Sequence, residues 1–274
     1  MGSQQNSLTE RAIDLRYEGR SDEAIALLKQ AVELDEPEAL RELAYALLGS
    51  PDPAAAVRLV KKAVKRGRTD LWSLLASLAA DLGQAKTADR AYRAAIEAGD
   101  LSALNDYGVF LRDQERYREA VEVLRRACDH GDVLAPGNLV AAYADDLSDL
   151  PAAIETGERY ADPERPSVYP ALAVAYARAG QLDKADDLFR QGIAAGARKA
   201  HQAYAWFLWD DKKDVVAAER QFWLAFEADE PGWSLGLGEL LAELGRVAEA
   251  RAVLERGAEW GDLDARALLQ ELDR

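Results

Sequence analysis

The side chains best suited to catalysis or metal binding are few in this 274-residue chain. It contains one cysteine, Cys128, and two histidines, His130 and His201. Cys128 and His130 form a Cys-x-His pair without a second pair of ligands, whereas zinc sites need three or four protein ligands. No phosphate-binding glycine-rich loop, nucleophile elbow or paired-histidine helix motif occurs. We therefore expect no metal site, no cofactor and no enzymatic activity. An enzyme on this scaffold would need a pocket of clustered titratable groups.

The composition narrows the classes of partner. The chain has 34 Lys and Arg against 49 Asp and Glu, a net charge of −15, which disfavours binding to nucleic acid or anionic lipid. One segment, Arg58–Arg68, is locally basic, and it is either a solvated helix face or a docking patch. There is no apolar run of 18 residues, so no membrane span is expected. A single cysteine and no apolar N-terminal segment indicate a cytoplasmic protein, and the many Ala and the excess of Arg over Lys indicate a bacterial genome.

A regular spacing of alanines reveals how the chain is organised. The sequence contains eight such alanines. In seven of the eight cases the side chain four residues after the alanine is large, and in seven of the eight cases the side chain seven residues after it is small. These offsets place the residues on one stripe of a helix. Each interval of the chain around one of these alanines is then expected to form two antiparallel amphipathic helices. This pair must stack on the next pair in order to bury its apolar stripe. The alanines, called anchor alanines below, recur every 32 or 33 residues: Ala24, Ala56, Ala88, Ala120, Ala152, Ala185, Ala218 and Ala250.

This pattern resembles the tetratricopeptide repeat family over about residues 5–262, and its Gly-Asp junctions also resemble SEL-like repeats. The fourth interval carries the resemblance best, through Leu104, Tyr107, Gly108, Leu111, Tyr117, Ala120, Leu124 and Ala127. We expect an all-α, right-handed superhelical α-solenoid of about eight two-helix repeats over residues 8–262. A flexible leader is expected at 1–7 and a capping helix at 263–274. Pro163, Pro166 and Pro170 favour a joint between two sub-solenoids near 160–170.

The resemblance implies that the first helix of each repeat lines a concave groove for a peptide or a partner helix. Arginines in that groove would pair with carboxylates of the partner, or would balance neighbouring acids of the chain itself. The full Lys/Asn/Arg clamp of the chaperone-binding members cannot be placed on these positions. The groove candidates are Arg16, Tyr17, Arg41, Tyr45, Asn105, Val109, Arg112 and Phe207, together with Ala141 and Val174.

The seventh repeat has an unusual density of aromatic residues. Trp206 occupies a position, twelve residues before the anchor alanine, that is small in six repeats. With Tyr204 and Trp209 it forms either part of the core or a secondary aromatic site for a partner.

Together these features predict a non-catalytic protein–protein interaction module, an adaptor or scaffold that binds a protein or peptide. The alternative is a ligand- or peptide-responsive regulatory subunit that acts through a separate output protein. Because both end repeats have polar outer faces, a monomer is favoured over a homo-oligomer.

Overall fold

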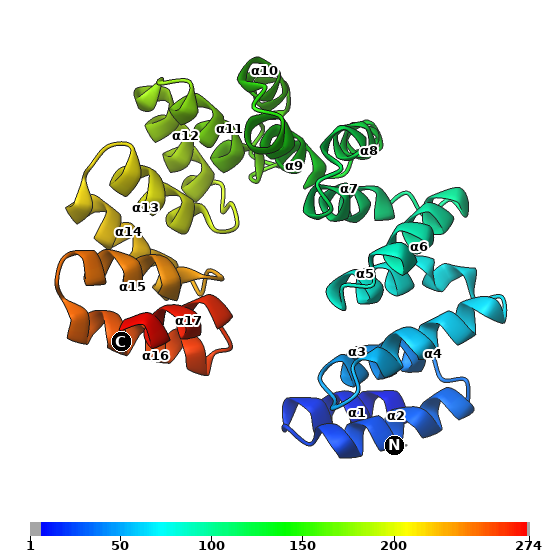
Figure 1. Ribbon diagram of the computed structural model, residues 1–274. Coiled ribbons are helices and arrows are strands. Elements are labelled where there is room, and N and C mark those ends of the chain that lie inside the picture. The colour runs from blue at the N-terminus through cyan, green and yellow to red at the C-terminus, as the bar shows by residue number, and fades with distance from the viewer. Residues whose placement is uncertain (1–6, 273–274) are drawn as a thin grey trace, which may run out of the picture. The chain divides into compact units, whose positions relative to one another are not determined.

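The computed structural model describes residues 7–272, and within that range it contains seventeen α-helices and no strand. Figure 1 shows the helices in antiparallel pairs. The pairs fall into two compact units, one ending at Gln114 and the other beginning at Glu115. The expected all-α solenoid of two-helix repeats is confirmed.

Unit 1 holds three complete repeats and the first helix of the fourth. A short 3-10 turn, Thr69–Leu71, precedes its fifth helix. Its helices are α1 (Leu8–Tyr17), α2 (Ser21–Glu33), α3 (Ala39–Leu48), α4 (Ala54–Lys65), α5 (Trp72–Asp81), α6 (Ala85–Glu97) and α7 (Ala103–Asp113).

Unit 2 begins with the second helix of the fourth repeat and ends with a single extra helix that packs on the eighth repeat. Its helices are α8 (Tyr117–Asp129), α9 (Ala135–Ala141), α10 (Leu150–Tyr160), α11 (Val168–Arg178), α12 (Leu182–Ala194), α13 (Ala200–Asp210), α14 (Val215–Glu227), α15 (Trp233–Glu243), α16 (Val247–Glu259) and α17 (Leu263–Leu272).

The core of each repeat is built by pairing small and large residues, as the stripe pattern predicts. Seven of the eight anchor alanines are completely buried. In the eighth repeat, a methyl group added to Gly238 would lie only 2.5 Å from a methyl carbon of Leu254. Helices α15 and α16 therefore approach closely because a bulky side chain sits directly against a residue that has none.

The fifth repeat departs from the expected register. Its fully buried alanine is Ala153, and Ala152 is only partly buried. A π-helical turn, Ala142–Asp146, follows α9, and Leu147 N–H bonds to the Ala142 carbonyl five residues earlier. Such a turn holds one more residue than an α-helical turn, which moves the buried face of the repeat by one position.

The proline-rich segment of this repeat lies inside unit 2. Helix α10 ends at Tyr160 and α11 begins at Val168, so that Pro170 falls in the first turn of a helix, where a missing N–H is tolerated. The division into compact units falls at Gln114 and Glu115 instead. A joint at 160–170 stays a prediction.

Acidic residues at the repeat junctions satisfy backbone groups at helix starts. The Glu36 carboxylate accepts hydrogen bonds from Leu8 N–H at 3.1 Å and Thr9 N–H at 2.9 Å, both at the start of α1. Asp132 and Asp262 cap the helix that follows each of them.

These junction acids share one position in the repeat, twelve residues after the anchor alanine. We did not recognise that regularity from the sequence. Arg68 and Ala197 replace the acid in the second and sixth repeats. Acids at this position are Glu36, Asp100, Asp132, Glu164, Glu230 and Asp262. Among them, Glu36, Asp132, Glu230 and Asp262 accept from backbone N–H groups at a helix start.

The first described residue, Ser7, lies at the start of α1. Of the expected leader, residues 1–6 lie outside the described residues, whereas Ser7 is the N-cap of α1. Its hydroxyl accepts from Glu10 N–H at 3.1 Å, and the Glu10 carboxylate accepts from Ser7 N–H at 2.9 Å. Ser7 therefore belongs to the first helix.

Candidate functional site

A hollow on the first-helix face of unit 1 lies between α1 and α3. This cavity has a volume of about 700 Å³. Two tyrosines dominate it, Tyr17 with 89% and Tyr45 with 44% of its surface exposed. We call it the tyrosine pocket, and its lining residues are Ile13, Arg16, Tyr17, Ser21, Glu42, Tyr45, Ala46 and Gly49.

The tyrosine pocket combines apolar walls with one ion pair. Arg16 Nη1 lies 2.7 Å from Glu42 Oε2, which joins α1 to α3, and both side chains remain partly exposed. Arg16 therefore balances an acid of its own chain, one of the two roles considered for the groove arginines. An exposed pair of this kind contributes little to stability, so both groups can exchange to a partner at small cost.

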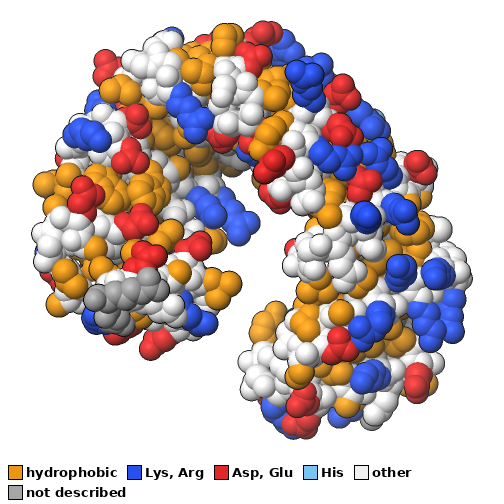
Figure 2. All heavy atoms as spheres, in the orientation of Figure 1, with side chains coloured by type: hydrophobic (Ala, Val, Ile, Leu, Met, Phe, Trp, Pro, Cys, Tyr) orange, Lys and Arg blue, Asp and Glu red, His pale blue; other side chains and the backbone are white. Residues whose placement is uncertain are grey.

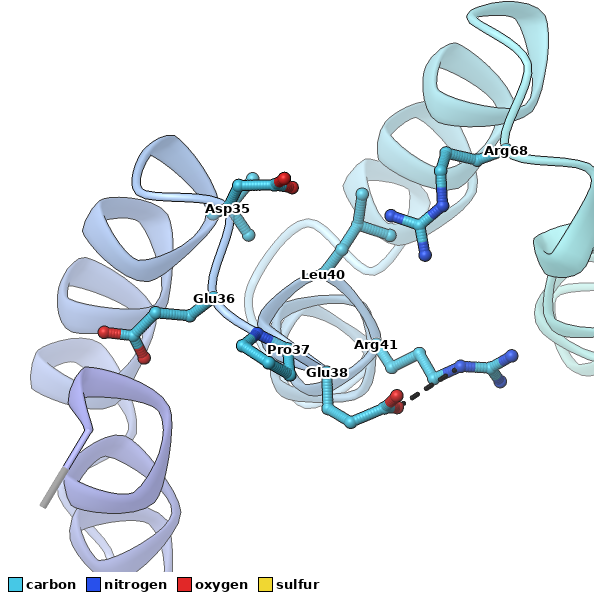
Figure 3. A pocket seen from close by; sticks show the side chains of 8 residues that line it. Asp35, Glu36, Pro37, Glu38, Leu40, Arg41 and Arg68 are labelled. Carbon is cyan, nitrogen blue, oxygen red and sulfur yellow. Dashed lines mark ion pairs between the residues drawn. The ribbon is translucent and has the colours of Figure 1, made fainter.

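Arg41 belongs to a different cavity, at the junction between the first and second repeats. Figure 3 shows this smaller hollow, of about 260 Å³, with Arg41 and Arg68 among the side chains that line it. Arg41 Nε lies 3.4 Å from Glu38 Oε2, and its Nη2 donates to the Asp70 carbonyl at 3.2 Å. These contacts hold the junctions before α3 and α5, so Arg41 is not grouped with Tyr17 and Tyr45.

The groove candidates on α7 have separate environments. Val109 is half-buried and lines another cavity of unit 1, between α5 and α7. Asn105 is buried, and its Nδ2 donates to Asp106 at 3.4 Å. Arg112 is half-buried on the same helix. Of these three residues, only Val109 lines a described cavity on the first-helix face of unit 1.

The aromatic candidates in the seventh repeat are mainly core residues. Phe207 is 3% exposed, and its ring lies 5.0 Å from that of Phe189. Tyr204 is also buried and donates from its hydroxyl to Asp186 at 2.7 Å. A large ring at the groove position of Phe207 thus turns into the core, which removes it from the first-helix surface.

Trp206 and Trp209 stack on each other with ring centroids 5.2 Å apart, and both are half-buried. The edge of Phe222 meets the Trp206 ring at 5.4 Å, an arrangement favoured by the charge distribution of aromatic rings. The ring at the usually small position is therefore accommodated by stacking along α13.

The basic segment lies on exposed surface of α4 and the junction after it. Figure 2 shows Lys and Arg side chains gathered over this region. Arg58 pairs with Asp52, and Arg68 with Asp70 at 2.8 Å. Lys61, Lys62 and Lys65 are exposed on the helix. Within this segment the two arginines at its ends balance local acids, and the lysines form a solvated face.

Two findings concern chemistry and membranes. Among residues 7–272, no three side chains of His, Cys, Asp or Glu are grouped closely enough to hold a metal ion. None of the helices in that range is both long and apolar enough to cross a membrane.

Burial and, after it, the negative charges of Asp129 and Asp132 raise the pKa of the Cys128 thiol to about 11, which keeps the thiol protonated near neutral pH.

Stacked helix pairs of this length define a helical-repeat protein. The tetratricopeptide repeat family matches residues 9–70, 73–138 and 213–266, which is more than half of the chain. The chain therefore belongs to the tetratricopeptide repeat family. No curated protein matches it.

Solved structures are similar to this chain at low sequence identity. Yeast Tom70 is 17% identical with a TM-score of 0.68, and the match covers 93% of this chain and 59% of that chain. Human IFIT1, solved as a dimer with PPP-AAAA, is 19% identical with a TM-score of 0.55, covering 92% of this chain and 68% of that one. A Sel1 repeat protein from Oxalobacter formigenes is 20% identical with a TM-score of 0.47, over 80% of this chain and 99% of its own.

Proposed function

We propose that this protein is a non-catalytic interaction module that binds a segment of a partner protein in the tyrosine pocket of unit 1. Repeats of this family typically serve protein–protein interaction, but fold alone does not identify the site. The observation that carries the proposal is the exposure of Tyr17 and Tyr45 beside a cavity of about 700 Å³.

The chemistry of the pocket supports a peptide as the ligand. Tyrosine provides a large apolar ring with few rotatable bonds and a hydroxyl for hydrogen bonding, which is why it is enriched at protein interfaces. Ile13 and Ala46 add apolar wall, and the Arg16–Glu42 pair offers both a donor and an acceptor at the rim. An apolar side chain flanked by polar backbone groups fits this combination.

The proposal is tested with the full chain and a display library of random peptides. Native protein should select peptides with a common apolar residue, and a Tyr17→Ser/Tyr45→Ser variant with unchanged helical content should lose them. The matched control, Leu34→Ser/Val216→Ser, removes two other exposed apolar side chains and should retain them. Selection of the same peptides by the tyrosine variant would contradict the proposed site.

A further inference from the structure

A second cavity of unit 1, between α5 and α7, repeats the geometry of the tyrosine pocket with different chemistry. Its volume is about 530 Å³. Counted from the anchor alanines, Asp81 and Asp113 occupy the position of Tyr17, and Asp106 occupies the position of Glu42. Since equivalent positions in stacked repeats face the same way, both cavities open on the first-helix face of unit 1. We call this cavity the acidic pocket. Its lining residues are Ser77, Ala80, Asp81, Gly83, Ala85, Tyr92, Asp106, Val109, Phe110, Asp113 and Gln114.

Two of the acids have no internal partner. Asp81 ends α5 and Asp113 ends α7, and both are exposed. Among the described residues, neither carboxylate has a hydrogen bond or an ion pair. Asp106, in the first turn of α7, accepts from Asn105 Nδ2. The carboxylates of Asp81 and Asp113 are thus available to a ligand of the pocket.

A buried tyrosine adds an independent sign of a ligand. Tyr92 of α6 is only 4% exposed, and its ring packs 5.3 Å from that of Tyr107 and 5.5 Å from that of Phe110. Within residues 7–272 its hydroxyl has no hydrogen-bond partner, and because no fully buried side-chain oxygen in that range lacks one, this hydroxyl is accessible from the cavity.

Tyr92 shares the cavity with the acids. Tyr92 lines the cavity, and after burial the causes that raise the pKa of its hydroxyl are Asp106, Asp81 and Asp113. These are the three carboxylates of the cavity wall. Tyr92 and the three carboxylates therefore line one cavity, where the Tyr92 hydroxyl is available as an acceptor.

The spacing of the acids favours an extended organic cation over a metal ion. No three of the acidic, His or Cys side chains described are close enough to share a metal. A planar guanidinium has five N–H donors, reaches acceptors on more than one helix and stacks on aromatic rings. Asp81 and Asp113 come from two helices, and Phe110 and Tyr92 add aromatic surface to the same cavity.

We propose that the acidic pocket binds an arginine side chain of the partner segment that the first-helix face of unit 1 accepts. This inference rests on the proposed function and specifies the partner further: its bound segment places an arginine at α5 and α7. Carboxylates of Asp81 and Asp113 accept from the guanidinium, and the Tyr92 hydroxyl accepts a further N–H.

The first test uses N-acetyl-arginine amide as the probe and the full chain as the receptor. Backbone amide shifts are followed by NMR during titration. We expect saturable shifts confined to α5, α6 and α7, and none with N-acetyl-citrulline amide, which has the same shape without the charge. Equal shifts with both probes, or no saturable shift with arginine, would overturn the proposal.

Two double variants distinguish binding in the acidic pocket from attraction by the overall negative charge of the chain. Asp81→Asn/Asp113→Asn should weaken binding of the arginine probe at least about tenfold. Glu33→Gln/Glu97→Gln changes the net charge equally at two exposed positions on α2 and α6 outside the pocket and should leave the affinity within about twofold. A similar loss in both variants would overturn the proposal, because it would show attraction by general charge.

Tyr92→Phe removes only the hydroxyl. Because that hydroxyl has no partner among the described residues, we expect an unchanged melting temperature and an affinity for the arginine probe reduced about threefold or more. Unchanged affinity would remove the tyrosine from the site and contradict the proposed binding mode. If the peptides of the display experiment bind while the arginine probe does not, this inference fails and the proposed function stands.

Discussion

Cys128 shows how burial at a single residue changes reactivity. The thiol is 8% exposed and has a pKa near 11, and only the thiolate is nucleophilic. We expect alkylation by iodoacetamide at neutral pH to be at least about a hundredfold slower than that of a free cysteine, and to become fast in denaturant. Rates measured by mass spectrometry test this. Equal rates in native and denatured protein would contradict the described environment of Cys128.

Glu36 links the stability of unit 1 to pH. Hydrogen bonds from Thr9 N–H, from the Thr9 hydroxyl and from Leu8 N–H lower the pKa of its carboxyl. The folded state therefore favours the charged form, and this stabilisation is complete above the ordinary carboxyl pKa of about 4.3 and is lost as pH falls through the lowered value. Glu36→Gln should melt at a lower temperature than native protein at pH 7, and the difference should vanish in acid.

The control for this prediction is Glu33→Gln, which alters an exposed acid on α2. Its melting temperature should match that of native protein at every pH. If Glu36→Gln behaved in the same way, the junction acid would not support α1.

At one position of the repeat, the size of the side chain decides whether the residue lines a cavity or lies in the core. Ile13, Tyr45, Val109 and Phe207 all stand eleven residues before an anchor alanine. The first three line cavities on unit 1, whereas Phe207 stacks in the core of unit 2. Repeat register predicts which positions are candidates, but it does not predict whether a ring finds space in the core. Asp81 and Asp113 also stand at a fixed distance from an anchor alanine, but acidic residues are so abundant in this chain that their spacing alone does not identify a site.

At the scale of elements, close helix packing depends on glycines whose missing side chain leaves room for a neighbour. A Cβ on Gly236 of α15 would lie 2.4 Å from Phe222 Cε1, and Phe222 of α14 is completely buried. We expect Gly236→Ala to destabilise unit 2 by about 1–3 kcal/mol, in spite of the higher helix propensity of alanine. Chemical denaturation measures the change.

Gly49→Ala is the matched control, because the nearest atom to a Cβ there is 3.9 Å away and its φ of −83° suits any residue. It should change stability by less than about 0.5 kcal/mol. Comparable losses in both variants would show that glycine is required for backbone freedom and not for space.

The fifth repeat marks the limit of prediction from spacing at this scale. Periodicity identified its two helices, but the π-helical turn at Ala142–Asp146 moved the buried alanine from Ala152 to Ala153. Tertiary packing determines whether the backbone forms an α-helical or a π-helical turn. Residue spacing does not predict that packing. The rest of the architecture followed from the alanine period because each repeat must bury the same stripe.

At the scale of the whole molecule, a net charge of −15 has a kinetic consequence. A partner segment with the arginine proposed for the acidic pocket would be attracted before contact. Its association rate constant should fall as ionic strength rises, while its dissociation rate constant should change much less. Stopped-flow fluorescence with an arginine-containing peptide from the display experiment measures both. A salt-independent association rate would contradict electrostatic attraction of the partner.

The proposed function requires a partner segment to lie directly on Tyr17. Its most direct test places the photo-crosslinking residue p-benzoylphenylalanine at position 17 and, as a control, at the exposed position 34 of the same unit. We expect irradiation with the selected peptide to give a covalent adduct from position 17 that excess unlabelled peptide suppresses, and no adduct from position 34. Adducts from position 34 alone, or none from position 17 with bound peptide, would contradict the account.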